Sequence, residues 1–553
     1  MPGDRADLAA TPGGPRMKTA SQGAEGRAPR RVRERARGWW EADGVGWLVV
    51  AAAAFTVAVA VFNPLSARLS GDEVVYASQI ATHVPLLQWN PQHARGVSLL
   101  VAPVTLLTSS AVILRAYLAV LAGAGLLVAL LAWRAVVRGR VLTLACVLFG
   151  GLWVAESLAV QLYPNYWIAL GGLAGVGLCL RCLRSPAPRW PALVLLAFAA
   201  AFTSLMRPQD AFFLFAPLVV AAVVVAARQP GRRRGLAAGA AMLAGLAAGV
   251  GDWVAEAYLY FGGPLNRAHL TSRYVGGTRF SPLNSLRIID GGRTSAVPGY
   301  PTVHGWPHPQ LLWWWAGFTL LALRGTWVAA RAEGWAVAVL PAASAAGIYL
   351  LYTVPVRDNY RYLVPIWALL SIPAAQGIAW LLTRWRHPAR VIVVALAAAF
   401  LAVELAAQHP LLMQHSAATQ AGSKAEDTIV TSLRQLGVRS PCVVTSVYRP
   451  NFAPISEAAG FYLGCTYLCP MARPTRGTGT GRLVVLTLGT APPRAQGSAP
   501  PWRYARNWDA HRLGLANLYA YLQPAGQPPL PVTRPGPHGH LALCFPGPPA
   551  PGR

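Results

Sequence analysis

Residues 45–62 read VGWLVVAAAAFTVAVAVF, a stretch without one charged side chain. Because a helix needs about 20 mainly apolar residues to cross a bilayer, this stretch predicts a transmembrane helix. Similar apolar blocks recur as far as residue 408. The sequence predicts a polytopic α-helical membrane protein with about eleven spans, near residues 45–62, 111–133, 141–160, 164–181, 190–206, 210–227, 235–255, 309–327, 332–353, 362–382 and 391–408.

The composition of the 553-residue chain agrees with a surface that is largely lipid. Hydrophobic residues make up 54% and charged residues only 12%, whereas a soluble protein carries about 25% charged residues. A cytosolic enzyme, a disordered protein and a disulfide-rich secreted module are therefore excluded. The net charge of +28 comes from Arg scattered between the apolar blocks, which suits contact with membrane lipids, so we expect no nucleic-acid partner.

The placement of Arg predicts how the chain crosses the membrane. Arg is frequent in alternate short loops, as at residues 134–140 and 228–234, and scarce in the short loops between them. Since cytoplasmic loops are the basic ones, we expect a multi-pass protein of the cell (plasma) membrane with a cytoplasmic N-terminus. The expected organisation is a cytoplasmic Arg-rich disordered tail (1–44), a transmembrane module (45–409) with outer loops 63–110 and 256–308, and an extracytoplasmic C-terminal domain (410–553).

The C-terminal region differs in character from the rest of the chain. It is rich in Pro and Gly, and its short apolar runs at residues 442–447, 483–488 and 540–545 are typical of buried strands bounded by turns. Segments 423–437 and 507–522 have helical periodicity. These features predict a small extracytoplasmic α/β domain.

The same region holds four of the seven Cys residues. In an oxidising compartment four Cys favour two disulfides, for which three connectivities are possible. A zinc site is the alternative, although the spacing matches no finger or ribbon. The disulfide candidates are Cys442, Cys465, Cys469 and Cys544.

Adjacent carboxylates follow the first span, at Asp72 and Glu73, in a chain with only 20 acidic residues. A carboxylate held at the membrane surface can act as a general base toward an acceptor hydroxyl. The alternative is a solvated loop in which the acid pair starts a helix. The sequence thus offers Asp72 and Glu73 as candidates for chemistry.

Several Arg residues are expected at the same membrane face as the acid pair. Arg207 interrupts an apolar stretch, and Arg357 and Arg361 lie between two spans. Guanidinium groups suit phosphate because they donate paired hydrogen bonds and stay ionised. The alternative is that each Arg extends to the interface for solvation alone.

A second acid pair, Asp252 and Glu256, shares a helix face at the end of the seventh expected span, because the two residues are four apart. Their partner could be a cation, a metal or a nearby Arg. A divalent cation is possible as a cofactor, with ligands from this pair and from Asp72 and Glu73, and no cofactor is certain.

Short motifs in the chain resemble those of the C superfamily of membrane glycosyltransferases (GT-C). The resemblance is to the group of protein O-mannosyltransferases and lipid A aminoarabinose transferases (glycosyltransferase 39-like), which take sugar from a polyprenyl phosphate. The motifs are GDEVVY at 71–76, HARG at 93–96, LMRPQD at 205–210, YFGGPL at 260–265 and NYRYLVP at 359–365.

The resemblance implies an enzyme that moves a hexose or a pentose, mannose being slightly preferred, from a polyprenyl-phosphate-linked donor to a glycan, lipid or protein acceptor, with inversion. It implies that Asp72 is the base and that Glu73 is its neighbour or substitute. Arg207 and Arg361, with Arg95, would hold the donor phosphate. Further site candidates are His93, Tyr76, Arg357, Asp252 and Glu256.

Two other classes of function stay open on the sequence. One is a polytopic transporter or lipid flippase, although we see no internal symmetry between halves of the chain. The other is a non-catalytic protein of cell-envelope assembly with the same ancestry, in which the acid pair would have no chemical task.

Overall fold

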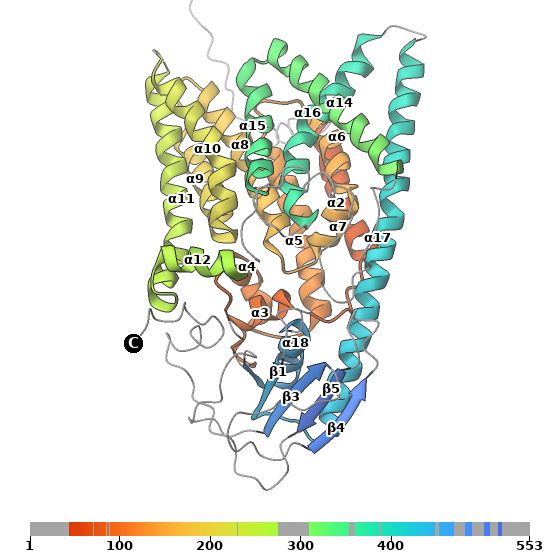
Figure 1. Ribbon diagram of the computed structural model, residues 1–553. Helices are drawn as coiled ribbons and strands as arrows, with labels where there is room; N and C mark the ends of the chain where they lie inside the picture. The colour runs from red at the N-terminus through yellow and green to blue at the C-terminus, as the bar shows by residue number, and fades with distance from the viewer. Residues whose placement is uncertain are drawn as a thin grey trace, which may run out of the picture.

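The structure, a computed structural model, describes residues 44–69, 71–84, 86–87, 89–228, 231–274, 309–352, 360–385, 389–447, 453–468, 482–488, 503–508 and 518–522. Helices dominate it, and a sheet lies at one end of the helical bundle (Figure 1). This end is called the sheet end below. The expected N-terminal tail, most of the second outer loop and the expected strand at 540–545 lie outside the described residues.

The helices form a bundle in which short helices connect the long ones. Their bounds are α2 (Val45–Phe62), α3 (Asp72–Ser78), α4 (Gly96–Thr105), α5 (Ala111–Leu131), α6 (Gly139–Gly150), α7 (Trp153–Ala159), α8 (Pro164–Arg184), α9 (Trp190–Met206), α10 (Pro208–Ala226), α11 (Arg232–Tyr260), α12 (Pro264–Tyr274), α14 (Pro309–Ala332), α15 (Trp335–Tyr352), the 3-10 turn η1 (Tyr360–Leu363), α16 (Val364–Arg384), α17 (Ala389–Gln435) and α18 (Ala453–Leu463).

Eight of the described helices are long and apolar enough to cross a membrane, and the count reaches nine if the pair α6 and α7 is one span. That pair bends by 81°, where the sequence predicts one continuous span. The bend lies at Gly150 and Gly151, and a Cβ on Gly151 would come within 2.7 Å of Leu405 in α17. The chain is polytopic and mainly helical, and the count of eleven spans stays a prediction.

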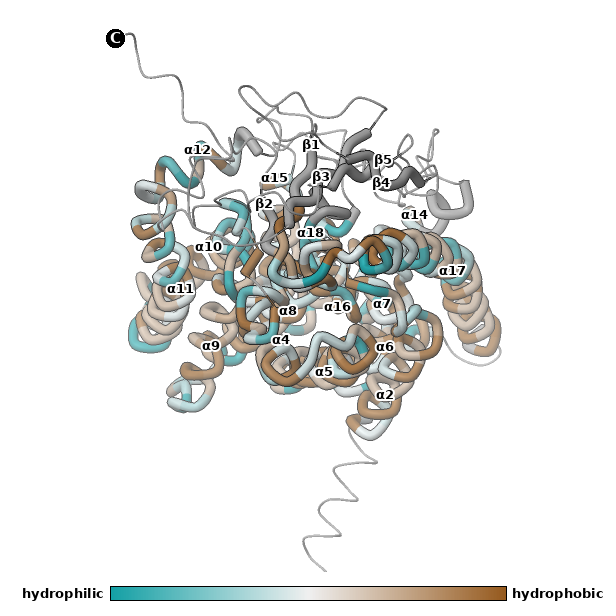
Figure 2. The backbone as a smooth tube through the Cα atoms, turned by 90° about the horizontal axis from the view of Figure 1, so that it is seen from below, coloured by the Kyte–Doolittle hydropathy of each residue, from teal (hydrophilic) through white to brown (hydrophobic). Residues whose placement is uncertain are grey.

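Helix α8 is the centre of the bundle. Of its apolar window 89% is buried, whereas 28% is buried in α11 and 11% in α17. Gly residues let neighbouring helices approach α8 closely: a Cβ on Gly171 would overlap Thr203, and one on Gly177 would overlap Trp133. The perimeter helices expose large apolar side chains, and apolar residues dominate them in Figure 2, as expected of helices that face lipid.

The C-terminal region contains a five-stranded sheet in the order β2-β1-β3-β5-β4. Strands β2, β1 and β3 are parallel, β5 pairs antiparallel with β3, and β4 pairs antiparallel with β5. A disulfide joins Cys442 at the start of β1 to Cys465, directly before β2. The strands are β1 (Cys442–Val447), β2 (Thr466–Leu468), β3 (Arg482–Leu488), β4 (Arg503–Trp508) and β5 (Leu518–Leu522).

Two helices expected in this region differ from the observed elements. Residues 423–435 are not a separate helix but the end of α17, which runs for 47 residues from the bundle to the sheet (Figure 1). The other expected helix, 507–522, is wrong where the structure describes it: residues 507 and 508 end β4, and residues 518–522, LYAYL, form β5. Tyr and Leu on a strand pair well with neighbouring strands, and this pairing outweighs the local helical periodicity.

Helices α17 and α18 bind the backbone that leads into α3. The Arg68 N–H donates to Ser423 Oγ at 2.9 Å, and the Leu69 N–H donates to the Tyr462 hydroxyl at 2.7 Å. The Arg68 side chain forms an ion pair with Asp427 and lies 4.3 Å from the centre of the Tyr462 ring. The C-terminal region thus holds residues 68 and 69 in place.

A glycine contact between α14 and α16 tests the bundle packing. A Cβ on Gly325 would lie 1.6 Å from the Pro373 carbonyl oxygen, whereas a Cβ on Gly251 would meet nothing within 4 Å. We expect Gly325→Ala to lower the free energy of unfolding by about 1–3 kcal/mol through overpacking. Gly251→Ala should be neutral or stabilise by up to about 1 kcal/mol. Unfolding in detergent measures both, and equal stability of the two variants would contradict the packing.

Candidate functional site

The acid pair lies in the first turn of α3, at the sheet end of the bundle (Figure 1). The helix starts after Gly71, whose φ of 53° lies in the region that favours glycine. Consecutive residues of a helix point about 100° apart, so the two carboxylates face different surroundings. The side chain of Asp72 is 25% exposed and that of Glu73 only 5%.

Asp72 lies between an imidazole and a guanidinium. Its Oδ1 is 3.4 Å from His93 Nε2, and its Oδ2 is 3.7 Å from Arg361 Nη2. Its partial exposure leaves it accessible to another molecule. The arrangement joins three of the sequence motifs, from α3, the loop before α4 and the turn η1.

Glu73 has a different environment, a buried ion pair with Arg115 of α5. Arg115 Nη1 and Nη2 donate to the two Glu73 oxygens at 3.1 and 2.9 Å. The Leu162 N–H donates to the same carboxylate at 3.1 Å. Both ionised side chains are almost fully buried. The geometry therefore favours Asp72 over Glu73 as the carboxylate that can meet a substrate.

Arg115 also joins separate segments of the backbone. A guanidinium has five N–H donors, and Arg115 donates to the carbonyls of Ala67 at 3.1 Å, Arg68 at 3.1 Å and Val160 at 2.8 Å, besides its two bonds to Glu73. The entry to α3 is thus tied to the segment between α7 and α8. Asp72 is the residue next to this point.

Arg207 lies between α9 and α10, in a cluster with two tyrosines. Its Nη1 donates to the Tyr352 hydroxyl at 3.0 Å. That hydroxyl lies 2.7 and 2.8 Å from the two oxygens of the fully buried Asp210. The rings of Tyr352 and Tyr362 stack with their centres 4.6 Å apart. The Arg207 side chain is therefore fixed by its hydroxyl contact and by the nearby carboxylate.

One tyrosine ring connects Arg207 with Arg361. The guanidinium carbons of Arg207 and Arg361 lie 5.1 and 5.3 Å from the centre of the Tyr362 ring. Arg361 also lies over the Tyr163 ring at 4.4 Å. Two cations, from distant parts of the sequence, thus converge on the side of the bundle where Asp72 lies.

Tyr76, one turn after Asp72, is a buried neutral phenol. Burial, together with the negative charge of Asp72, raises its pKa well above the usual value. Its ring packs against the rings of His93, with centres 4.7 Å apart, and Trp89, with centres 5.8 Å apart. Tyr76 therefore shapes the surroundings of Asp72 in its protonated form.

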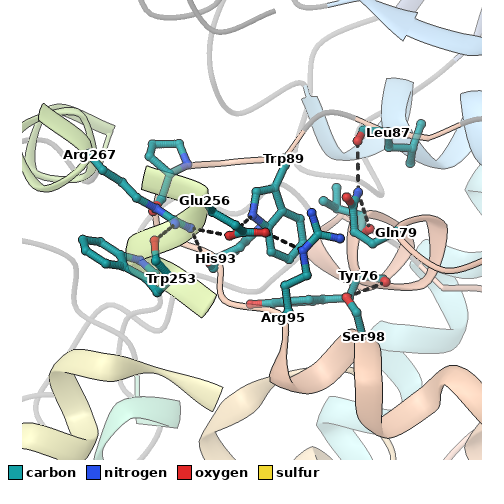
Figure 3. A network of polar contacts seen from close by, with 12 residues as sticks. Tyr76, Gln79, Leu87, Trp89, His93, Arg95, Ser98, Trp253, Glu256 and Arg267 are labelled. Carbon is teal, nitrogen blue, oxygen red and sulfur yellow. Dashed lines mark hydrogen bonds and ion pairs between the residues drawn. The ribbon is translucent and has the colours of Figure 1, made fainter. Parts of the chain in front are cut away.

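Glu256 forms a second cluster beside these rings, shown in Figure 3. It accepts hydrogen bonds from Arg95 Nε, from Arg267 Nη2 at 3.1 Å and from the Trp89 indole at 3.2 Å. Arg95 also lies over the Trp89 ring at 5.1 Å. Glu256 thus fixes the Nε edge of Arg95, whose side chain stays 27% exposed.

Arg267 of α12 is the most enclosed cation of this cluster. It donates to the carbonyls of Pro91 at 3.0 Å, Trp253 at 2.7 Å and His93 at 2.7 Å, in addition to Glu256. Its burial lowers its pKa to about 10, against the opposite effect of the Glu256 charge. It stays a cation at neutral pH and holds the segment that carries His93.

The expected metal ligands do not converge. Glu73 is bound by Arg115 and Glu256 by Arg95 and Arg267, while Asp252 interacts electrostatically with the Glu256 cluster. In the part of the chain that the structure describes, no group of three or more His, Cys, Asp or Glu side chains is placed to hold a metal ion. The four carboxylates therefore do not fit one divalent-cation site.

Three candidates from the sequence, Arg357, Cys469 and Cys544, lie outside the described residues. Apart from Glu73, which pairs with Arg115, the remaining site candidates lie in two adjacent groups. One group is Asp72, Tyr76, His93, Arg207 and Arg361, and the other is Arg95, Asp252 and Glu256.

The overall arrangement is similar to that of solved membrane proteins. The structure of ArnT from Cupriavidus metallidurans in the apo state aligns with a TM-score of 0.56 and 14% identity, over 87% of this chain and 98% of that one. ArnT bound to undecaprenyl phosphate gives a TM-score of 0.50 and 13% identity over the same shares. The chain has the GT-C fold.

The chain also aligns with the oligosaccharyltransferase AglB from Archaeoglobus fulgidus, in complex with an inhibitory peptide and a dolichol-phosphate. The TM-score is 0.49 and the identity 12%, over 77% of this chain and 65% of that one. No protein-family model matches the sequence, and no curated protein matches it either.

Sequence reasoning missed several residues of the candidate site. Arg115 stands alone among apolar residues near the start of α5, and an isolated Arg in an apolar stretch is a signal of a buried partner. Two of the sequence motifs contain Asp210 and Tyr362, and an expected span contains Tyr352. Nothing in the sequence distinguishes these three residues from their neighbours. Their pairing depends on how α10, α15 and η1 pack.

The Arg115–Glu73 pair is a test of what fixes α3. We expect Arg115→Met to lower the free energy of unfolding by about 3–5 kcal/mol, because it leaves a buried carboxylate unpaired. Adding Glu73→Leu should recover part of this loss. The exposed pair of Arg184 and Glu333, 3.5 Å apart, gives a matched control, since Arg184→Met should cost no more than about 1 kcal/mol. Equal losses for the two Arg variants would contradict the assignment.

Proposed function

We propose that the chain is an integral-membrane glycosyltransferase, which moves a sugar from a polyprenyl-phosphate donor to an extracytoplasmic acceptor with inversion at the anomeric carbon. The observation that carries the proposal is the partly exposed Asp72 carboxylate 3.7 Å from Arg361, which shares the Tyr362 ring with Arg207. The fold supports it as well, since ArnT with this fold has been solved bound to undecaprenyl phosphate.

In the proposed reaction, Asp72 takes the proton of the acceptor hydroxyl. The acceptor oxygen forms a bond to the anomeric carbon, while the bond from that carbon to the phosphate oxygen breaks. The phosphate leaves with the bonding electrons, and inversion follows from attack on the opposite face. Positioning and stabilisation of the departing charge supply most of the acceleration in such a reaction.

Arg207 and Arg361 are proposed to bind the donor phosphate. Both lie around the Tyr362 ring, and Arg361 is also 3.7 Å from Asp72. A phosphate that displaced this long contact would gain a charge-assisted hydrogen bond and leave Asp72 more basic. Arg95 is the third candidate, because Glu256 holds its Nε edge while the side chain stays partly exposed.

The roles of the other candidates follow from their contacts. Glu73 positions α3 through Arg115 and does not take part in the chemistry. Glu256 fixes Arg95 and Arg267, and Asp252 interacts with both electrostatically. A divalent cation is not part of the proposed reaction step, because the four carboxylates do not converge, and its contribution is a matter for assay.

The proposal also includes the membrane topology and the donor sugar that we expect from the sequence. They are eleven spans, a cytoplasmic N-terminus, a sheet end that faces the outside of the cell membrane, and a donor carrying mannose or a pentose. The acceptor is a glycan, a lipid or a protein. A donor anchored in the bilayer suits a site at the end of a helical bundle, because the lipid tail stays among the apolar perimeter helices.

The first test is donor turnover by the purified protein in nanodiscs, with a panel of polyprenyl-phosphate sugars and acceptors. We expect release of polyprenyl phosphate by the wild type and a loss of about 10²- to 10⁴-fold in Asp72→Asn, the range for removal of a general base. Glu333→Gln is the matched control, since this carboxylate also pairs with an Arg but lies in the turn between α14 and α15. Turnover that survives in Asp72→Asn, or no turnover of any donor, would refute the proposal.

The phosphate assignment makes a separate prediction. Arg361→Lys keeps the charge but loses the paired donors, so we expect the KM for the donor to rise by about tenfold. Arg361→Gln should lower kcat/KM by about 10²- to 10³-fold, the cost of one lost transition-state donor. Steady-state kinetics with the donor as the varied substrate measures both. A change in the KM for the acceptor alone would contradict the assignment.

A further inference from the structure

His93 is a buried histidine beside the proposed base. It is 2% exposed, and its Nε2 is 3.4 Å from Asp72 Oδ1. Within the described residues, neither ring nitrogen forms a hydrogen bond. A buried polar group without a hydrogen bond costs free energy, so a shift of a few tenths of an ångström toward Asp72 would be favourable.

The surroundings hold His93 in this position. The backbone N–H of His93 donates to the Asn90 carbonyl at 3.1 Å, and the backbone carbonyl of His93 accepts from Arg267 Nη2 at 2.7 Å. Its ring packs against Tyr76 and Trp89, with centres 4.7 and 5.4 Å apart. Figure 3 shows His93 beneath the Glu256 cluster, between the ends of α11 and α3. The imidazole therefore has a fixed backbone and a ring confined by its neighbours.

The charged groups around His93 come from four elements. Helix α3 supplies the Asp72 carboxylate and the neutral Tyr76 phenol. The residue before α4, Arg95, contacts Trp89, and α11 and α12 supply Glu256 and Arg267, which satisfy each other. Among the described side chains, Asp72 is the carboxylate within ion-pair distance of the imidazole. The charge of His93 thus acts mainly on Asp72.

We propose that His93 is the positioning residue of Asp72 and makes the glycosyl transfer sensitive to acid. In its neutral form, Nε2–H donates to Asp72 Oδ1 and leaves Oδ2 for the acceptor proton. In its protonated form, the imidazolium pairs with Asp72 and lowers the basicity of the carboxylate. The inference rests on the proposed role of Asp72.

The direction in which pH changes the transfer rate follows from the charge that His93 gains on protonation. Acidification converts His93 into a cation, which stabilises ionised Asp72 and weakens it as a base. The transfer therefore slows as pH falls.

The kinetic test is the pH profile of kcat/KM for donor turnover in the wild type, His93→Gln and His93→Phe. We expect the acidic limb to move down by about one pH unit or more in His93→Gln, with kcat about two- to tenfold lower and the KM for the donor unchanged. His93→Phe should lose about 10- to 100-fold at neutral pH, because it removes the donor to Oδ1. His83→Gln is the matched control, an exposed histidine of the same loop, and should keep the wild-type profile. An unchanged acidic limb in His93→Gln would overturn the inference.

A second measurement does not depend on activity. Histidine NMR of the full-length protein, with the His93 signal assigned by its absence in His93→Gln, gives the titration midpoint of this residue. We expect the midpoint to fall by about half a pH unit or more in Asp72→Asn, because the variant removes the paired negative charge. The same midpoint in both proteins would overturn the His93–Asp72 pairing. A lowered midpoint without donor turnover would reject the glycosyltransferase and retain the pairing.

Discussion

The buried ion pair of Arg115 and Glu73 determines where the proposed base lies. An ionised pair in a low-dielectric interior is tolerated only when its geometry is good and its other hydrogen-bonding groups are satisfied. Here the guanidinium binds both carboxylate oxygens and three backbone carbonyls. The entry to α3, helix α5 and the segment after α7 therefore meet at this ion pair. Asp72 is the residue directly before Glu73, so the ion pair also fixes its position.

Two further groups of cations are arranged around this fixed point in different ways. Arg207 and Arg361 lie around one tyrosine ring. Arg95 and Arg267 share a carboxylate, Glu256. The first arrangement brings two cations to one aromatic ring, whereas the second places a carboxylate between two cations. The same residue type thus pairs with an aromatic ring at one place and with a carboxylate at the next.

The helices were predictable because hydropathy is a local property of the sequence: each expected span overlaps a helix or the bent pair of α6 and α7. The candidates Asp72, Arg207 and Arg361 were recognisable because polar residues at the ends of apolar blocks stand out. The partner of Glu73 was not predictable, because it depends on packing between α3 and α5. Nor was β5, since the pattern of LYAYL fits a helix until its neighbouring strand is known.

Helix α17 connects the membrane-spanning bundle to the backbone before α3. Its 47 residues, among them Pro410, correspond to a helix of about 70 Å, so that a tilt of about 5° moves the far end by about 6 Å. That end carries Ser423 and Asp427, which hold the backbone before α3. Because a span adjusts its tilt to the thickness of the surrounding bilayer, the lipid composition of the host membrane becomes a variable of the geometry around Asp72.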